Sequence, residues 1–207
     1  PHLADRLKRL ADAALVAGSS EQLLGVEGSA ARMYFEGFLS MVSAESRVDT
    51  SGFVENGRKR RPPPDPVNAL LSFCYSLLVK DLTVVLYAIG FDPYYGVFHR
   101  PRFGRPALAL DLAEEFRPLL CESVVLQVLN NGEVGPRDFK TRAGGCMLEA
   151  SGRKAVLRAY ERRLDHEITH PQFGYRASYR RILDVQARLL GAVVLGELEQ
   201  YTPMVTR

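Results

Sequence analysis

One histidine and three carboxylates in this sequence have the types and spacing of a site for a divalent metal ion. His99 lies in a connector rich in glycine, proline and aromatic residues, and the segment after it carries Asp111 and Glu114. Their i, i+3 spacing lets both carboxylates face the same way on a helix. With Glu27 they form a set of oxygen ligands and one imidazole, which suits Mg²⁺ or Mn²⁺. Such sites keep open coordination positions and act on phosphate oxygens.

Each of these acids also has a simpler structural explanation. Asp111 and Glu114 lie near the expected start of a helix, where the helix dipole favours acidic side chains. They are interleaved with leucines, and a carboxylate drawn toward a packed surface is costly unless it is paired or bound to a metal ion. Glu27 lies among small residues that permit close approach of another element, or it is a solvated acid in a first helical turn. Residue types and spacing leave both explanations open.

The other histidines and the tyrosines are weaker candidates. His166 and His170 are spaced i, i+4 near the end of an expected helix and would form half of a metal site, as in a helical phosphohydrolase. No HExxH motif surrounds them, and the helix dipole also favours histidine near a helix C-terminus. Tyr75 lies in an apolar helix, whereas Tyr94 and Tyr95 lie in the connector. Packing or stacking explains these tyrosines better than a nucleophilic role.

The elements that would position these side chains are almost all helical. Apolar residues recur at helical spacing over six stretches, which are residues 3–16, 20–38, 67–89, 107–129, 153–168 and 175–198. Asp65 as N-cap and Pro66 at the first helical position predict a sharp helix start. The stretch after them is apolar on most faces, which predicts one long central helix. Pro118 is expected to kink or split the helix over 107–129.

Irregular segments interrupt this helical pattern. Residues 43–66 predict a long basic loop, and Gly25 and Gly28 are expected to interrupt or tighten the start of the second helix. Residues 139–142 and 146–149 flank an Ala-Gly-Gly turn and predict a small β-hairpin. The fold class is therefore all-α, with a single multi-helix domain over residues 1–207, one long central helix and possibly a hairpin near 139–149.

The composition is that of a globular protein. The 207 residues are 46% hydrophobic and 25% charged, with a net charge of only +3. Three scattered cysteines without a CxxC pair argue against a disulfide framework or zinc site and favour a reducing cytoplasm. We find no apolar stretch of the ~18 residues that would span a bilayer and no signal peptide, so no membrane association is expected.

The basic residues are clustered, which the net charge conceals. Arg58, Lys59, Arg60 and Arg61 form one block in the expected loop, and Arg102 and Arg105 follow His99. Such clusters suit contacts with DNA phosphates, which are salt-dependent and independent of sequence. Further arginines recur along the two last expected helices. Glu161, Asp165 and Asp184 accompany them, so about half of these arginines are expected to belong to solvated, acid-paired faces.

Four motifs in order carry a resemblance to a known family. They are GVEGSAAR at 25–32, RPPPDPVNALLSF at 61–73, GFDPYYGVFH at 90–99 and GRPALALDLAEEFRP at 104–118. With them, the chain resembles the CRISPR-associated spacer-integration endonuclease, the integrase subunit of CRISPR adaptation, over about residues 20–200. The resemblance implies a metal-dependent DNA nuclease and integrase with an all-helical catalytic domain.

The resemblance also implies roles for particular residues and partners. Glu27, His99 and Glu114 would hold Mg²⁺ or Mn²⁺, and Asp111 corresponds to a further acid near the site. Many family members have Asp where this chain has Glu114, so Asp111 and Glu114 could share or exchange the ligand role. The nucleophile would be the 3′-hydroxyl of a captured spacer, which attacks a phosphodiester at a repeat end. The implied partners are double-stranded DNA, both spacer precursor and CRISPR repeat, a second copy in a homodimer, and a small ferredoxin-fold adaptation protein.

One departure from the family concerns the N-terminus. The family normally carries a β-rich N-terminal domain, whereas this chain begins directly in the helical pattern, as a fragment or a part of a larger fused protein would. An alternative function is therefore a non-catalytic helical DNA-binding or assembly module whose acids are structural. The third alternative is the helical phosphohydrolase that uses His166 and His170.

Overall fold

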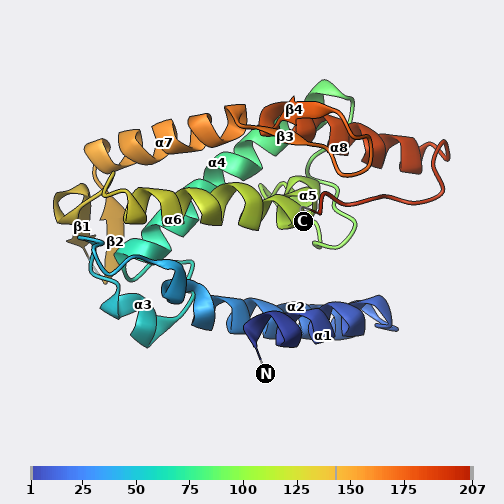
Figure 1. The fold of residues 1–207 in the computed structure, drawn as a ribbon. Coiled ribbons are helices and arrows are strands. Elements are labelled where there is room, and N and C mark those ends of the chain that lie inside the picture. The colour runs from blue at the N-terminus through green and yellow to red at the C-terminus, as the bar shows by residue number, and fades with distance from the viewer. Residues whose placement is uncertain (1, 143, 206–207) are drawn as a thin grey trace. The chain divides into compact units, whose positions relative to one another are not determined.

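The computed structural model describes residues 2–142 and 144–205, and it is mostly helical with two small antiparallel hairpins (Figure 1). The all-α expectation is thus confirmed. The chain divides into two compact units. The first unit comprises residues 1–70 and 128–153, and the second comprises residues 71–127 and 154–207.

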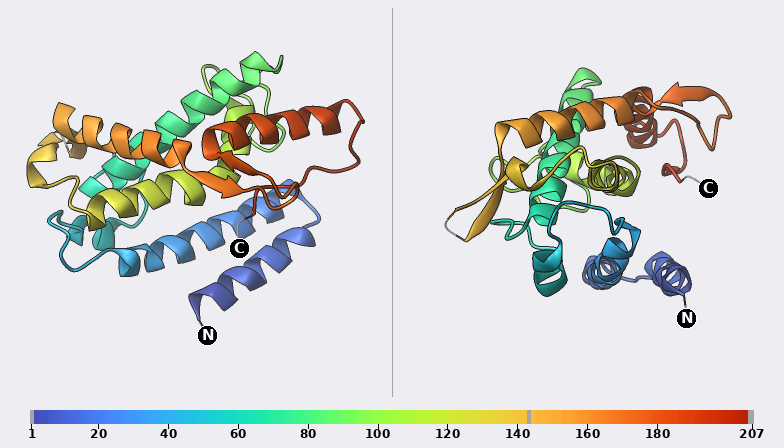
Figure 2. Two further views of the ribbon diagram at one scale, coloured as in Figure 1. Left: turned by 45° about the horizontal axis from the view of Figure 1, so that its top comes forward. Right: turned by 60° about the vertical axis from the view of Figure 1, so that its left-hand side comes forward.

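The first unit begins with two antiparallel helices, α1 (Leu3–Leu15) and α2 (Ser20–Phe38), which lie side by side (Figure 2). The Ser19 hydroxyl caps α2 by accepting the N–H of Gln22 at 3.2 Å. The expected interruption at Gly25 and Gly28 is wrong, since α2 continues through both. A glycine inside a helix costs only about 1 kcal/mol, which the rest of a long helix tolerates.

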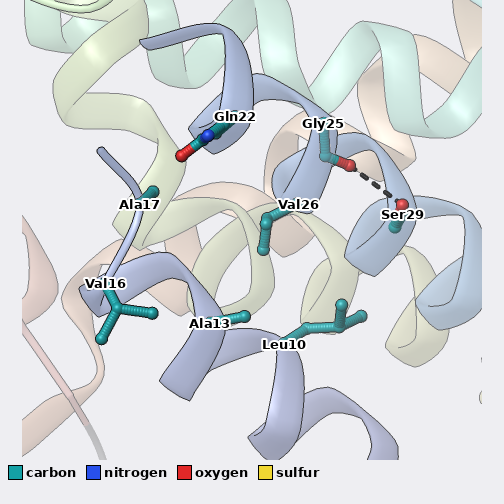
Figure 3. A pocket seen from close by; sticks show the side chains of 8 residues that line it. All are labelled: Leu10, Ala13, Val16, Ala17, Gln22, Gly25, Val26 and Ser29. Atoms are coloured by element: carbon teal, nitrogen blue, oxygen red, sulfur yellow. Dashed lines mark hydrogen bonds between the residues drawn. The ribbon is translucent and has the colours of Figure 1, made fainter. Parts of the chain in front are cut away.

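A shallow apolar hollow lies between α1 and α2 (Figure 3). Leu10 and Ala13 of α1 face Val26 of α2 across it, and it encloses about 420 Å³. Among the residues that the structure describes in α1, none is buried, and α1 packs against α2 at the surface of the unit.

The segment over residues 43–66 is not the continuous loop that the sequence predicts. It contains a short helix, α3 (Ser51–Asn56), and a single 3₁₀ turn, η1 (Leu39–Met41), precedes it. Phe53 of α3 is buried against Phe35 and Phe38 of α2, with ring centroids 6.2 and 6.1 Å apart. A helix of six residues with one buried side chain is too short to show a helical periodicity in the sequence, and it depends on packing for its stability.

The long central helix is confirmed as α4 (Pro66–Ala88). Oδ1 of Asp65 accepts the N–H of Asn68 at 2.9 Å, which makes Asp65 the expected N-cap, and Gly90 follows the helix end at φ +95°. By length and composition α4 passes the test for a membrane span, contrary to expectation, but core helices of soluble proteins pass the same test. Its apolar side chains Leu70, Leu78, Leu82 and Leu86 are fully buried in the protein.

The second unit contains α5 (Ala107–Phe116), a π-helical segment η2 (Arg117–Glu122) and most of α6 (Ser123–Asn130). The kink expected at Pro118 takes the form of this π-helical segment. Proline has no N–H to donate, and a widened i→i+5 turn accommodates the missing hydrogen bond. Arg117, at the start of this segment, still donates its backbone N–H to the Ala113 carbonyl as in an α-helix, and it becomes important at the site below.

The first of the last two helices begins and ends three residues earlier than the sequence predicts, and the second is shorter than predicted. α7 (Ala150–Asp165) and α8 (Tyr179–Val194) are joined by a second hairpin, β3 (Glu167–Thr169) with β4 (Arg176–Ser178), in which Ile168 pairs with Ala177. The β-branched pair Ile168 and Thr169 favours the strand, and the Ser178 hydroxyl caps α8 by accepting the N–H of Arg181. The hairpin expected near 139–149 is confirmed as β1 (Phe139–Arg142) with β2 (Gly145–Leu148), although Ala143 of its turn lies outside the described residues.

Glu115 of α5 holds the segment that follows α8. Its carboxylate accepts the Tyr201 hydroxyl at 2.5 Å and the backbone N–H of Met204 at 2.8 Å. The side-chain amide of Gln186 donates to the Tyr201 oxygen at 2.9 Å. Burial raises the pKa of the Glu115 carboxyl in spite of these donors. The C-terminal segment is therefore held to the second unit by a buried polar network.

Candidate active site

His99 and Asp111 form the best-defined polar pair in the second unit. The Nδ1 atom of His99 lies 2.6 Å from Oδ1 of Asp111, and the two side chains are only 15% and 14% exposed. A carboxylate only accepts hydrogen bonds, so Nδ1 carries the proton and donates it to Asp111. This pairing leaves Nε2 of the ring with its lone pair, which is the form of histidine that binds a metal ion.

The same carboxylate also holds the backbone of the connector. Oδ2 of Asp111 accepts the N–H groups of Val97 at 2.7 Å and Phe98 at 3.0 Å, and Oδ1 accepts the N–H of His99 at 2.8 Å. With the imidazole, Asp111 thus accepts four hydrogen bonds. Its lone pairs are occupied, so Asp111 orients His99, and Glu114 is left as the carboxylate of α5 that can bind a ligand.

Gly96 allows the connector to lie this close to α5. A Cβ atom at Gly96 would be 2.5 Å from the carbonyl oxygen of His99 and 2.7 Å from Cβ of Ala107. The Pro93 carbonyl accepts the N–H of Leu108 at 2.9 Å, which ties the other end of the connector to the first turn of α5. The sequence signal for this approach was the GFDPYYGVFH motif, in which Gly96 stands three residues before His99.

Glu114 lies on the side of His99 opposite Asp111. Its Oε1 atom is 3.9 Å from Nε2 of His99. Two ligands that each lie ~2.1 Å from one octahedral ion are ~3.0 Å apart when adjacent and ~4.2 Å apart when opposite. The two atoms are therefore within range of one Mg²⁺ or Mn²⁺ and would become adjacent ligands after a shift of about 1 Å. In this structure the guanidinium of Arg117, three residues further on, donates to the Glu114 carboxylate at 2.5 Å.

Arg117 is a site residue that sequence reasoning missed. It is only 9% exposed, and its guanidinium lies 5.0 Å from the ring centroid of Tyr75, whose hydroxyl donates to Glu122 at 2.5 Å. Tyr75 therefore supports a buried cation, which is more than the core role expected for it. The signal that could have found it is its i, i+3 spacing from Glu114, which places the two side chains on one face of a helix.

Glu27 belongs to the first unit, whereas His99, Asp111 and Glu114 belong to the second. Glu27 is half-buried on α2. Apart from chain neighbours and the backbone of α2 itself, no atom of the described residues lies within 4 Å of the Cβ positions at Gly25 and Gly28 beside it. Among residues 2–142 and 144–205, no group of three or more His, Cys, Asp or Glu side chains is already assembled for a metal ion. The second unit by itself brings together two candidate ligand groups, His99 and Glu114, and the acid that orients His99.

The basic loop of the first unit is only partly available to a ligand. Nη1 of Arg58 donates to Oδ1 of Asn68 at 2.8 Å and to the carbonyl of Lys59, so the Arg58 side chain is turned inward. Lys59, Arg60 and Arg61 are exposed. They are the part of the block that can contact a phosphate backbone.

Three arginines of α8 are paired with acids, as the simpler explanation predicts for about half of the arginines in the last two helices. Arg180 binds Glu161 at 2.7 Å and Asp165 at 3.0 Å. Arg181 and Arg188 both bind Asp184, at 2.6 and 3.1 Å. In contrast, Arg102 is exposed and Arg105 half-buried in the connector beside His99.

His166 and His170 do not form the helical pair that the sequence suggests. The helix ends at Asp165, so His166 is exposed while His170 follows strand β3 and is 2% exposed. Nδ1 of His170 accepts the N–H groups of Gln172 and Phe173 at 3.3 and 3.4 Å. His170 thus stabilises the turn of the second hairpin, and the phosphohydrolase pair loses its geometric basis.

Comparison with known proteins assigns the family. The family model described as CRISPR associated protein Cas1 matches residues 2–162, and the chain belongs to this family. It is 52% identical over 194 residues to a Cas4 exonuclease/Cas1 endonuclease fusion of Geobacter sulfurreducens, covering 94% of this chain and 34% of that protein. It is 45% identical over 203 residues to a Cas1 endonuclease of Thermus thermophilus, covering 98% of this chain and 59% of that protein.

Solved structures agree with this assignment. The Cas1 protein TM1797 of Thermotoga maritima superposes with a TM-score of 0.80 at 28% identity, covering 99% of this chain and 60% of that one. A chain of a partial Cas6-RT-Cas1–Cas2 complex superposes with a TM-score of 0.80 at 26% identity, covering 98% of this chain and 58% of that one. This chain therefore spans between one third and three fifths of the proteins named here.

Proposed function

We propose that this chain is the helical catalytic part of a metal-dependent DNA endonuclease and integrase that inserts captured DNA into a CRISPR array. The observation that carries the proposal is the order Asp111–His99–Glu114, in which one acid orients the imidazole and the other lies 3.9 Å from its free nitrogen. The names of the related endonucleases support the same activity.

The metal ligands in this proposal are His99 through Nε2, Glu114 and, as the family resemblance implies, Glu27. A bound Mg²⁺ or Mn²⁺ would supply Lewis-acid stabilisation of charge on a phosphodiester. Asp111 keeps the imidazole proton on Nδ1 throughout, so the ring stays in its ligand form. Arg117 neutralises the Glu114 carboxylate in this structure, and it would remain as a buried positive charge at the site if Glu114 held a metal ion.

The reaction that we propose is a transesterification. The 3′-hydroxyl of the incoming strand loses its proton and attacks phosphorus, so that the new ester bond forms. The bond to the 3′-oxygen of the repeat strand breaks, and that oxygen takes up a proton to leave as a hydroxyl. Water in place of that hydroxyl gives a nick. Lys59, Arg60, Arg61, Arg102 and Arg105 are proposed to hold the phosphate backbone of double-stranded DNA.

The partners that we propose are inferred from those of related proteins. One solved relative is a component of a complex that contains Cas2, and we propose a small ferredoxin-fold protein of that kind as the partner here, with a second copy of this protein in a homodimer. All three cysteines are buried free thiols, which suits the proposed location in a reducing cytoplasm.

Binding of Mn²⁺ to the chain, followed by calorimetry, tests the proposal separately from activity. His99→Ala and Glu27→Ala should each lower Mn²⁺ affinity and abolish strand transfer into a repeat duplex, whereas His166→Ala, an exposed histidine of the same unit as His99, should change neither. No Mn²⁺ binding to the unaltered chain would favour the non-catalytic module. Loss only on substitution of His166 or His170 would favour the phosphohydrolase.

A further inference from the structure

The second unit buries a cation and a carboxylate at the two ends of one short segment. Arg117 begins the π-helical segment η2 and Glu122 ends it, and the two residues are only 9% and 4% exposed. Hydrogen bonds of a π-helix join residues five apart, so Arg117 and Glu122 lie about one turn apart. Widened turns of this kind occur frequently at functional sites. Buried opposite charges are costly unless they are paired or hydrogen-bonded, so the two groups need each other or other partners.

Tyr75 of α4 contacts both charged groups. The Arg117 guanidinium lies 5.0 Å from the centroid of the Tyr75 ring, and the Tyr75 hydroxyl donates to Oε1 of Glu122 at 2.5 Å. Burial raises the pKa of the Cys121 thiol, Glu122 raises it further and Arg117 lowers it, so both charges act on the same thiol. The cation and the buried carboxylate are thus neighbours across one tyrosine ring.

Arg117 keeps part of its hydrogen-bonding capacity in reserve. Its Nη1 atom donates to the Glu114 carboxylate at 2.5 Å, whereas its buried Nε atom has no hydrogen-bond partner among the residues that the structure describes. A buried donor without an acceptor is unfavourable. The Glu114 side chain is 33% exposed, so a cation from solvent can reach it. Arg117 therefore lies between a carboxylate that solvent reaches and one that is buried.

We propose that Arg117 is an exchangeable partner of Glu114, whose guanidinium turns to Glu122 when Glu114 takes up a divalent cation. The inference rests on the proposed function, which makes Glu114 a metal ligand. Two cations at one carboxylate repel each other, so the guanidinium is driven away from an occupied Glu114. Glu122, about one turn along η2, keeps its charge compensated. Arg117 and Glu122 are thus positioning residues that set the affinity for the cation.

This exchange predicts effects of opposite sign at the two ends of the segment. Arg117→Gln removes the competitor and should strengthen Mn²⁺ binding in calorimetry about 5- to 50-fold, the range for one charge-assisted hydrogen bond that solvent partly screens. Glu122→Gln removes the second acceptor, keeps Arg117 at Glu114 and should weaken Mn²⁺ binding by a similar factor.

A double variant shows whether the two effects depend on each other. In Arg117→Gln/Glu122→Gln no guanidinium is left to relocate, so Mn²⁺ affinity should lie within about twofold of that of Arg117→Gln. The double variant also removes both buried charges together, which avoids the uncompensated carboxylate that Arg117→Gln leaves behind. If Arg117→Gln alone does not fold, the double variant should still bind Mn²⁺ more tightly than the unaltered chain.

Arg163→Gln is the matched control for disturbance of the segment. Arg163 also lies on a tyrosine ring, 4.9 Å from the centroid of Tyr179, and its Nε donates to the Leu119 carbonyl of η2 at 2.8 Å. Its replacement removes a contact of the same segment without removing a competitor from Glu114. Mn²⁺ affinity should therefore stay within about twofold of that of the unaltered chain.

A measurement without metal follows the exchange itself. Glu114→Gln neutralises the carboxylate, so Arg117 should turn to Glu122 even in EDTA. In ¹⁵N-labelled protein, the Nε–H resonance of Arg117, assigned by its loss in Arg117→Gln, should shift in Glu114→Gln. The same resonance should shift in the unaltered chain on saturation with Mg²⁺. Neither shift should appear when Glu122→Gln is also present.

Weaker or unchanged Mn²⁺ binding in the double variant would overturn the proposal, because Arg117 would then support Glu114 as a ligand. So would unchanged Mn²⁺ affinity in Glu122→Gln, or an Arg163→Gln effect as large as that of Arg117→Gln. Failure of the proposed function has a different signature, namely no Mn²⁺ binding to the unaltered chain. The resonance in EDTA still decides the exchange in that case, since an Arg117 signal that Glu114→Gln leaves in place would rule it out.

Discussion

His99 Nδ1 donates to Asp111 at 2.6 Å, while the Asp111 carboxylate also accepts the N–H of His99 itself at 2.8 Å. One acid thus fixes both the ring and the backbone of the same histidine. Replacement of Asp111 by Asn turns an acceptor into an NH₂ donor that faces other donors. Asp111→Asn should therefore lower Mn²⁺ affinity about 10- to 100-fold, as loss of an orienting partner does at other metal sites.

Nuclear magnetic resonance of the imidazole gives a readout that a purely structural role would not move. The Nδ1 proton of His99 should shift upfield and exchange faster in Asp111→Asn. An unchanged Mn²⁺ affinity in a variant that remains folded would show that Asp111 does not position the ligand.

Gly96→Ala should damage the site through sterics alone. The new methyl group would meet the His99 carbonyl and Ala107 at less than 3 Å, so the connector must move away from α5. We expect a loss of about 1–3 kcal/mol in the free energy of unfolding, measured in urea, and weaker Mn²⁺ binding. Gly28→Ala is the control, since its Cβ meets open space inside α2 and alanine favours a helix by up to about 1 kcal/mol.

Removal of the exposed charges in the basic loop should change how DNA affinity depends on salt. With Lys59, Arg60 and Arg61 all replaced by Gln, the slope of log K against log salt concentration should fall in magnitude by roughly 2 to 3, at ~0.9 per phosphate contact. The same replacement at Arg180, Arg181 and Arg188 is the control, because acids already neutralise these arginines. Equal slopes for the two triple variants would contradict the assignment of the loop.

The cysteines should be unreactive in the folded chain. Burial raises the pKa of the Cys74 thiol to about 12 and raises the pKa of the Cys121 and Cys146 thiols as well. At pH 8 the reactive thiolate form of Cys74 is therefore only ~10⁻⁴ of the total. Labelling with a thiol reagent should be slow without denaturant and should reach all three residues in guanidinium. Rapid labelling of the native chain would show that the burial is incomplete.

Tyr201→Phe should release part of the C-terminal segment and give stability a steeper pH dependence. The lost hydrogen bond to a carboxylate is worth about 1.5–3 kcal/mol. Burial raises the pKa of Glu115 and the Tyr201 hydroxyl lowers it, so the variant should have a higher Glu115 pKa still.

The sign of the pH effect follows from linkage. A carboxyl whose pKa is raised on folding binds more protons in the folded state, so its contribution to stability is present at low pH and lost as pH rises through the folded pKa. The deficit of Tyr201→Phe relative to the unaltered chain should grow from pH 5 to pH 7 in thermal unfolding. Tyr95→Phe, which alters an exposed tyrosine, should show no such trend.

The parts of the site that the sequence predicts correctly are those whose structure depends on a few neighbouring residues. Asp65 at a helix start and the i, i+3 pair Asp111 and Glu114 follow from rules that involve a few neighbouring residues. The pair of Glu114 with Arg117 has the same i, i+3 spacing and was open to the same rule, whereas the inward turn of Arg58 depends on Asn68, which lies ten residues away in the sequence. The sequence predicts His170 near a helix end, whereas the structure has strand β3 after Asp165. A three-residue strand gains its stability from pairing with another strand and is too short to show an alternating hydrophobic pattern.

Glu114 and Glu115 are consecutive and chemically identical, yet each makes its contacts with a different part of the second unit. One contacts His99 and Arg117, and the other contacts Tyr201 and Met204. Helix α5 therefore supports both the candidate site, through Glu114, and the segment that follows α8, through Glu115. Peptides or fusion partners that separate Tyr201 and Met204 from Glu115 would remove contacts that stabilise α5, the helix that carries Asp111 and Glu114. A label attached after residue 205 would therefore be expected to change the geometry of the candidate site through α5.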